Sequence, residues 1–212
     1  MELNKIIKYL IASDLIFYTG WGLISPIFAV FILQNIYGGS VFVVGMASAV
    51  HLITRSLLRV PFGMKADKSQ KIAFNFMFWG LLIAALVPLG FIFVVNAWSI
   101  YVLQAVLGIS LAMSTAGWTS VFAKHMDRGK ESTEWGIDAV AVGIGPGIAG
   151  ALGGLAVTFF SFNLVFITVA VFGLLGTFLL LLIRKDVLKY KDGCGKLFVS
   201  HEIRRLKKAR VH

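Results

Sequence analysis

Residues 51–71 read HLITRSLLRVPFGMKADKSQK and pass from an apolar segment into a basic loop. His51, Arg55 and Arg59 follow one another at intervals of four residues, so a helix presents all three on one face. Basic side chains in an otherwise apolar helix are costly in lipid unless they meet an anion or water. The stretch therefore predicts a membrane helix whose neighbours supply acidic groups or a hydrated cavity.

The composition of the whole chain is that of an integral membrane protein. Hydrophobic residues make up 58% of the 212 residues, charged residues make up only 14%, and the mean hydropathy is +0.85. Apolar runs long enough to cross a bilayer occur at residues 6–33, 41–63, 72–95, 98–122, 135–160 and 164–183. We therefore predict an all-α integral membrane protein with six transmembrane helices.

The positions of the basic residues predict the topology. The net charge is +10, yet the connections at residues 34–40, 96–97 and 161–163 contain no Lys or Arg. The basic residues gather instead before the first span, around the second and fourth connections, and after residue 183. The positive-inside rule then places both termini in the cytoplasm, which agrees with an even number of spans. Topology accounts for the basicity, and nucleic-acid binding is disfavoured.

We divide the chain into a six-helix transmembrane domain, residues 1–185, and a basic cytoplasmic tail, residues 186–212. Within the tail, residues 201–210 are rich in Arg and Lys, a composition suited to an anionic membrane surface. The single cysteine, Cys194, also falls in the tail and has no partner for an internal disulfide. The expected location is a cell membrane, plasma or inner, which the chain crosses several times.

Polar side chains form a stripe along the first predicted span. The stripe consists of Asp14, Tyr18, Trp21 and Ser25, spaced by four, three and four residues. Asp14 lies at a depth similar to that of Arg55, and a buried ion pair would spare both residues the cost of an isolated charge. Alternatively, Asp14 binds a proton or a cation. Pro26, further along the span, predicts a bend beside a cavity.

Further polar residues lie within the second and fourth spans. His51 either relays protons or is a neutral histidine hydrogen-bonded to a neighbouring helix. Gln104 and Thr115 belong to a series of small and polar residues that either contact substrate or allow close helix packing. No G-x-S-x-G or H-E-x-x-H motif occurs, and His51 has no second ligand at metal-binding spacing. We therefore expect no enzymatic activity, metal site or cofactor.

Two motifs resemble those of major facilitator superfamily transporters. Residues 63–71 read GMKADKSQK and resemble the family signature G-x-L-A-D-R-x-G-R-R in the glycine, the Ala-Asp pair and two basic positions. Residues 143–154 read GIGPGIAGALGG and resemble the G-x-x-x-G-P-x-x-G-G pattern in the fifth helix of the family's exchangers. The steps from Gly143 to Gly147 and from Gly150 to Gly154 favour close approach of another helix. Gln104 stands where the family usually has an arginine.

The resemblance covers about residues 1–185 and implies the amino-terminal half of such a transporter. Because the two halves of the family's fold are parallel repeats, it implies a half-size secondary active transporter of a small molecule. The protein would work as a homodimer with a midplane cavity between copies. The pathway residues would be Asp14, Tyr18, Trp21, Ser25, His51, Arg55, Gln104 and Thr115, whose carboxylate and aromatic rings suit an organic cation or aromatic amphiphile. The alternative is a non-transporting membrane subunit, or a partner half of a larger carrier.

The resemblance also implies interface and conformational residues. In the family the loop aspartate docks against the repeat equivalent of the fifth helix, so Asp67 of one copy would meet residues 132–136 of the other. Arg59 would contact Asp138 across the same interface. In the rival interpretation, Arg59 reaches lipid headgroups and Asp67 caps its own loop. The full set is Arg59, Gly63, Asp67, Lys68, Lys71, Asp138, Gly143, Gly145, Pro146, Gly147, Gly150 and Gly154. Expected partners are the lipid bilayer, the substrate, and a second copy or another six-helix half.

Overall fold

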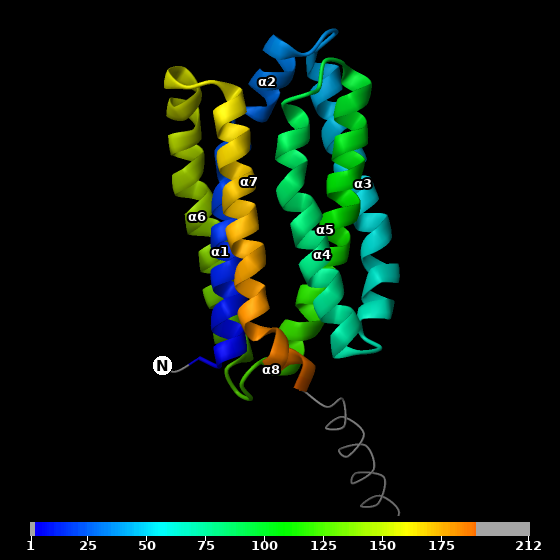
Figure 1. Ribbon diagram of the computed structural model, residues 1–212, viewed down its shortest axis with the longest axis vertical. Helices are drawn as coiled ribbons and strands as arrows, with labels where there is room; N and C mark the ends of the chain where they lie inside the picture. Colours follow the sequence, from blue (N-terminus) through cyan, green and yellow to red (C-terminus); the bar gives the residue numbers. More distant parts are fainter. Residues whose placement is uncertain (1–2, 190–212) are drawn as a thin grey trace, which may run out of the picture.

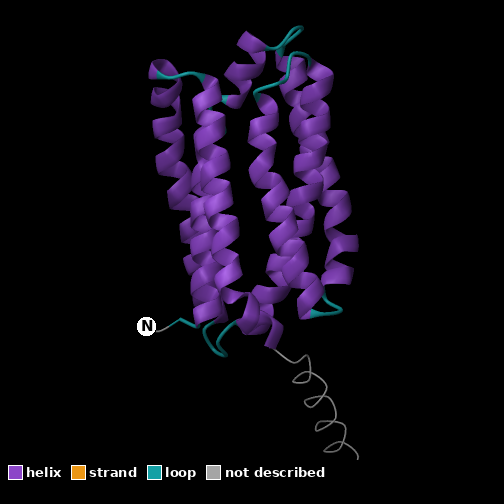
Figure 2. Ribbon diagram, viewed as in Figure 1, coloured by secondary structure: helices purple, strands orange, loops and turns teal. Residues whose placement is uncertain are grey.

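The computed structural model describes residues 3–189, and nearly all of them are helical (Figures 1 and 2). The helices are α1 (Lys5–Ile24), α2 (Phe28–Asn35), α3 (Val41–Ala66), α4 (Gln70–Phe91), α5 (Ala97–His125), α6 (Glu131–Phe159), α7 (Phe162–Leu179), the 3₁₀ helix η1 (Leu180–Ile183) and α8 (Arg184–Lys189). Within this part of the chain six helical segments are long and apolar enough to cross a membrane, so the predicted all-α fold with six spans is confirmed. Most of the predicted tail, including Cys194 and residues 201–210, lies outside the described residues.

The first crossing is broken between α1 and α2. The backbone N–H of Ser25 still donates to the carbonyl of Trp21 at 3.2 Å, whereas that of Ile27 donates to Ile24, only three residues back, at 3.0 Å. Pro26 lies between them and has no N–H to continue the helical pattern. The bend predicted from Pro26 is therefore confirmed.

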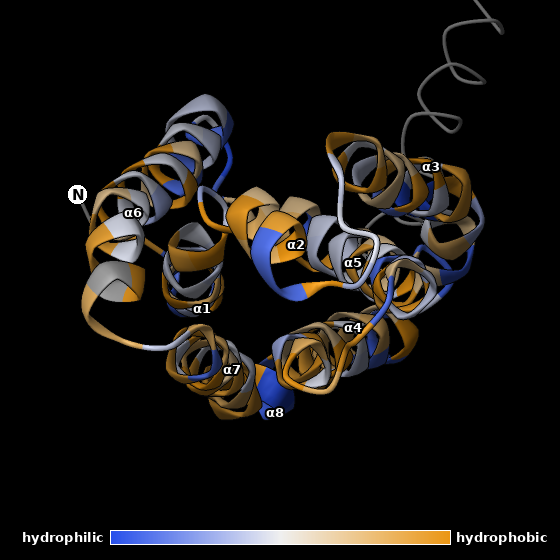
Figure 3. Ribbon diagram, turned by 90° about the horizontal axis from the view of Figure 1, so that it is seen from above, coloured by the Kyte–Doolittle hydropathy of each residue, from blue (hydrophilic) through white to orange (hydrophobic). Residues whose placement is uncertain are grey.

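The helices pack as two groups of three. Helix α1 lies between α6 and α7, and α5 lies between α3 and α4, while α4 and α7 join the two groups. Seen from above, α4 and α7 form one side of the bundle, and α3 and α6 are the outer arms of the other side (Figure 3). Phe31 of α2 packs edge-on against Phe166 of α7, with ring centroids 4.9 Å apart, near the end where α2 lies. Helices α1 and α5 thus occupy the centre.

Glycines bring α4 and α5 into backbone contact. A Cβ atom added to Gly80 of α4 would lie 2.5 Å from the backbone nitrogen of Ser114 on α5. A Cβ atom on Gly117 of α5 would meet the backbone of Ala73 and would lie 2.5 Å from the nitrogen of Met77 on α4. Small residues at both crossings allow the tight packing that stabilises helix pairs in lipid. Small residues therefore hold α4 and α5 in close contact, and α5 also contributes to the cavities described below.

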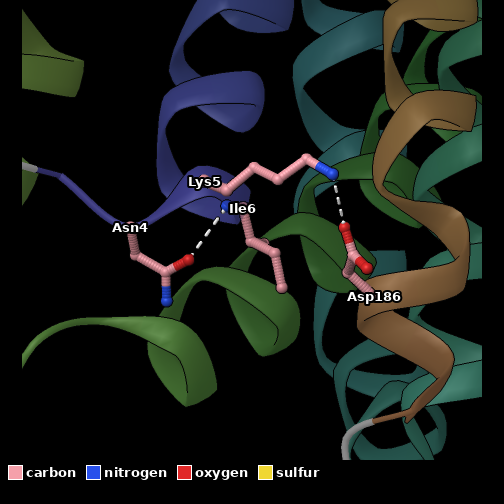
Figure 4. Close-up of polar contacts among 4 residues, drawn as sticks. All are labelled: Asn4, Lys5, Ile6 and Asp186. Carbon is pink, nitrogen blue, oxygen red and sulfur yellow. Dashed lines mark hydrogen bonds and ion pairs between the residues drawn. The ribbon is translucent and has the colours of Figure 1, made fainter.

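Both ends of the described chain lie at the same end of the bundle (Figure 1). The side chain of Asn4 accepts a hydrogen bond from the N–H of Ile6 at 3.0 Å, and Lys5 forms an ion pair of 2.8 Å with Asp186 of α8 (Figure 4). Val187 of α8 is fully buried. This arrangement agrees with an even number of crossings. The assignment of this end to the cytoplasm stays a prediction from charge.

Candidate functional site

Helices α1, α3, α5 and α6 line two cavities on the side of the bundle opposite α4 and α7. The upper cavity, toward α2 in Figure 1, has a volume of about 400 Å³, and its polar lining comprises Tyr18, Trp21, Ser25, Ser48, His51 and Gln104. The lower cavity, toward the N-terminus, has a volume of about 480 Å³, and its charged and aromatic lining includes Asp14, Tyr18, Arg59, Trp118, Trp135 and Asp138. The residues of the polar stripe predicted along the first span therefore line cavities, and their role in a transport pathway stays a prediction.

The upper cavity is mostly apolar and contains unsatisfied hydrogen-bonding groups. His51 of α3 and Gln104 of α5 both line this cavity, and the Nδ1 atom of His51 is buried without a hydrogen-bond partner. The indole Nε1 of Trp21 is also buried without a partner. Both interpretations of His51, a proton relay and a neutral histidine hydrogen-bonded to a neighbouring helix, stay predictions. A ligand in this cavity would meet hydrogen-bonding side chains and no carboxylate among the lining residues.

The lower cavity contains two carboxylates from different helices. Asp14 of α1 and Asp138 of α6 both line it and interact electrostatically. Asp138 is only 8% exposed, and its Oδ1 atom has no hydrogen-bond partner. Trp118 of α5, also 8% exposed, contributes an indole Nε1 that is buried without a partner. The lower cavity is therefore acidic and aromatic, in contrast to the upper one.

Contacts of Arg55 mark the boundary between the two cavities. Its Nη2 atom donates to the hydroxyl of Thr115 on α5 at 3.4 Å, and its charge interacts electrostatically with Tyr18 on α1. Tyr18 and Leu111 line both cavities. The structure contains no ion pair within 4.0 Å between Asp14 and Arg55, so the predicted pair is absent from this conformation. Arg55 instead donates to the hydroxyl of Thr115, and the acidic neighbour of Asp14 comes from α6.

The loop after α3 borders a third cavity of about 250 Å³, which is lined by Arg59, Gly63, Asp67, Ser120 and Lys124. Asp67 is exposed and ends α3, with its backbone N–H bonded to the carbonyl of Gly63 at 3.0 Å. Lys68 is exposed, and Lys71 lies in the first turn of α4.

Arg59 lines this cavity and also the lower cavity, where Asp138 lies. The side chains of Arg59 and Asp138 form no ion pair within 4.0 Å in the described chain. The contacts predicted between copies stay predictions.

The glycines of α6 divide between two faces. Pro146 packs against Gly22, and Gly145 against Leu15 and Thr19, all of which lie on α1. Gly150 belongs to the same face, because a Cβ atom there would lie 3.5 Å from the carbonyl oxygen of Gly22. Gly143 and Gly147, in contrast, have nothing within 4 Å of a Cβ position, and Gly154 is exposed. The sequence motif therefore combines an internal packing face with an exposed face that includes Gly147 and Gly154, while Gly143 also lines the lower cavity.

Sequence reasoning missed Trp118 and Trp135, two main components of the lower cavity. A usable signal was present, because Trp118 follows Leu111 and Thr115 at helical spacing on one face of α5. Trp135 precedes Asp138 by three residues, and the two therefore share a face of α6. Without the packing of α5 against α1 and α6, however, neither tryptophan could be told from an interfacial aromatic residue.

A family model described as Major Facilitator Superfamily matches residues 10–201, almost the whole chain. The chain belongs to the Major Facilitator Superfamily. The resemblance inferred from the loop after α3 and from the glycine motif of α6 is thereby confirmed. No curated protein matches the sequence.

Two solved structures share the fold of this chain. One is a crystal structure of peptide transporter POT in complex with sulfate, with a TM-score of 0.71, 15% sequence identity, and coverage of 98% of this chain and 45% of that chain. The other is a mutant of peptide transporter POT, also with sulfate, with a TM-score of 0.69, 15% identity, and coverage of 97% and 44%. The chain thus spans a little under half the length of these structures. At this identity the likeness concerns the fold alone.

Proposed function

We propose that this six-helix unit is one half of a secondary active transporter of a small molecule, and that a second copy of the chain covers its cavity-bearing side. The observation that carries the proposal is the pair of cavities on membrane-length helices, both of which are lined in part by polar or charged side chains. Charged groups such as Asp14, Asp138 and Arg59 are too costly to face lipid tails. A second helical unit would enclose them at the level of the membrane, as in transporters built from parallel repeats.

The charges on the two outer arms support pairing between identical copies. Helix α3 carries Arg59, Lys65 and other basic residues toward its end, whereas α6 starts with Glu131 and contains Asp138. A two-fold axis along the membrane normal would set α3 of one copy beside α6 of the other, and would provide each contact twice. Asp67 would then lie near the start of the other copy's α6, where helix dipole and carboxylate attract one another.

The expected location follows from the same arrangement. The unit would lie in a cell membrane, with both termini on the cytoplasmic side. The proposed protein comprises a transmembrane domain, residues 1–185, and a basic tail, residues 186–212. The described chain continues into α8, where Asp186 pairs with Lys5, so the start of this tail contacts the bundle.

The homodimer is tested by its mass in nanodiscs and by a cysteine crosslink. The native cysteine is first removed by Cys194→Ser. Met64→Cys then introduces a cysteine on an exposed part of α3, and Gly136→Cys introduces one on an open part of α6. Differently tagged chains, each with one of these cysteines, should crosslink on oxidation when they are co-expressed. Each single-cysteine chain expressed alone is the matched control. A monomeric mass together with the absence of a mixed crosslink would refute the homodimer.

A further inference from the structure

The two carboxylates of the lower cavity have no cationic partner within ion-pair distance among the described residues. Asp14 and Asp138 interact electrostatically across this cavity, and neither forms an ion pair within 4.0 Å with any described residue. Asp138 is more than nine-tenths buried and has an unpartnered Oδ1 atom. A buried carboxylate without a partner is costly, and a second carboxylate nearby increases that cost when both are ionised. A cation between the two carboxylates would reduce both the cost of burying an unpaired charge and the repulsion between the two groups.

The chain's own arginines do not fill this position. Arg55 donates to the hydroxyl of Thr115 and interacts electrostatically with Tyr18, which also lines the upper cavity. Arg59 is exposed and lines both the lower and the third cavity, so it lies toward the end of the bundle that carries the N-terminus. The carboxylates of α1 and α6 therefore face a cavity of about 480 Å³, a volume within the range of small-molecule sites.

The remaining wall of the lower cavity is aromatic. The rings of Trp118 and Trp135 have centroids 5.5 Å apart, and Phe122 stacks on Trp118 at 4.4 Å, which fixes the orientation of that indole. Both indoles line the same cavity as the two carboxylates. Indole faces attract cations and also pack against apolar groups. Charge and aromatic surface are thus presented together to a single ligand.

From these observations we propose that the lower cavity binds an aromatic or aliphatic organic amine in its cationic form. The ammonium group would lie between Asp14 and Asp138, and the apolar body would lie against Trp118 and Trp135. The inference rests on the proposed function, because it names the substrate class of that pathway. The hydroxyls of Ser114 and Thr119, which also line the cavity, would accept further hydrogen bonds from the ammonium group.

The test compares four probes of similar size and different charge on the unaltered chain in nanodiscs. Phenethylammonium is a cation, 2-phenylethanol is neutral, 3-phenylpropionate is an anion and phenylalanine is a zwitterion. Isothermal titration calorimetry should show the cation bound about tenfold or more tightly than the alcohol, as expected for hydrogen bonds between charged partners. Equal binding of cation and alcohol would overturn the proposal. Tightest binding of phenylalanine would also overturn it, in favour of a site that uses Arg59.

Variants locate the site. Asp14→Asn and Asp138→Asn should each weaken phenethylammonium about tenfold, with little effect on the alcohol, whereas the matched change Asp127→Asn in the loop before α6 should leave both unchanged. If the asparagine variants do not fold, Trp135→Leu keeps both carboxylates and should weaken the cation about threefold or more. Loss of binding in Asp127→Asn alone would place the site elsewhere and overturn the assignment.

The outcome is separable from that of the homodimer test. The mass of the protein is measured in the same nanodiscs that are used for titration. A monomer that prefers the cation supports the ligand assignment and removes only the homodimer. A dimer that shows no preference for the cation refutes the ligand assignment and leaves the homodimer intact.

Discussion

Helices α5 and α6 are equal in length, 29 residues each, and nearly equal in hydropathy, 1.6 and 1.4 over their most apolar windows. Their surroundings differ, because 56% of that window is buried in α5 and 28% in α6. Both glycines of α5, Gly108 and Gly117, pack against neighbouring backbones, whereas Gly143 and Gly147 of α6 face open space. Hydropathy alone therefore identifies a span, and the surroundings of its glycines distinguish a central helix from an outer helix.

The physical reason lies in the solvent. In lipid, apolar side chains gain little by leaving the surface of the bundle, so helices associate where small residues allow close approach. Internal glycines in α5 are already used in this way. The open glycines of α6 have no such neighbour within the bundle, and under the proposed homodimer a helix of the second copy would pack against them. We therefore expect substitutions of α5 glycines to affect folding, and substitutions of the open α6 glycines to affect association between copies.

The largest effect is expected at the internal glycine of α5. Gly117→Ala places a Cβ atom against the backbones of Ala73 and Met77, and neither backbone can move without separating α4 from α5. We expect the free energy of unfolding, measured by SDS titration in mixed micelles, to fall by about 1–3 kcal/mol or more. The matched control is Gly143→Ala in α6, which should change it by less than about 0.5 kcal/mol. Equal effects of the two substitutions would contradict the comparison.

The next effect concerns association rather than folding. Gly147→Leu fills open space on α6 and leaves the packing of α6 on α1 untouched, so the monomer should fold normally. Under the proposed homodimer, the dissociation constant measured by energy transfer in liposomes should rise about tenfold or more, equivalent to about 1.4 kcal/mol. Leu175→Ala on the exposed surface of α7 serves as control. An unchanged dissociation constant would assign the open face of α6 to lipid.

Much of the fold could be predicted from sequence, because the hydropathy of each span is a local property of its residues. The helix break is likewise indicated locally, by Pro26. The site was harder. The stripe containing Asp14 and Tyr18 was visible, but its partners depend on which helices become neighbours. Equal depth in the bilayer suggested Arg55 for Asp14, whereas packing of α1 against α6 brings Asp138 instead. Depth along the membrane normal can be estimated from sequence position, but it does not determine which helices are neighbours in the bundle.

A smaller effect is expected at the boundary between the cavities. Thr115→Val removes the hydroxyl that accepts a hydrogen bond from Arg55 and keeps the shape of the side chain. The free energy of unfolding should fall by about 0.5–1.5 kcal/mol, the usual net contribution of a hydrogen bond. Thr119→Val, one turn further along α5, lines the lower cavity without such a bond and should cost less. If Thr119→Val costs as much, the bond from Arg55 contributes nothing measurable.

The smallest expected quantity is a coupling free energy between Asp14 and Arg55. The two residues form no ion pair, since α5 satisfies Arg55 through Thr115 and α6 supplies the electrostatic neighbour of Asp14. A double-mutant cycle with Asp14→Asn and Arg55→Gln should therefore be additive within about 0.5 kcal/mol, apart from an indirect contribution through Tyr18. The cycle formed by Arg55→Gln and Thr115→Val is the positive control and should show measurable coupling. A larger coupling in the first cycle would mean that the protein also adopts a conformation in which α1 and α3 form the ion pair, and that α6 then moves away from Asp14.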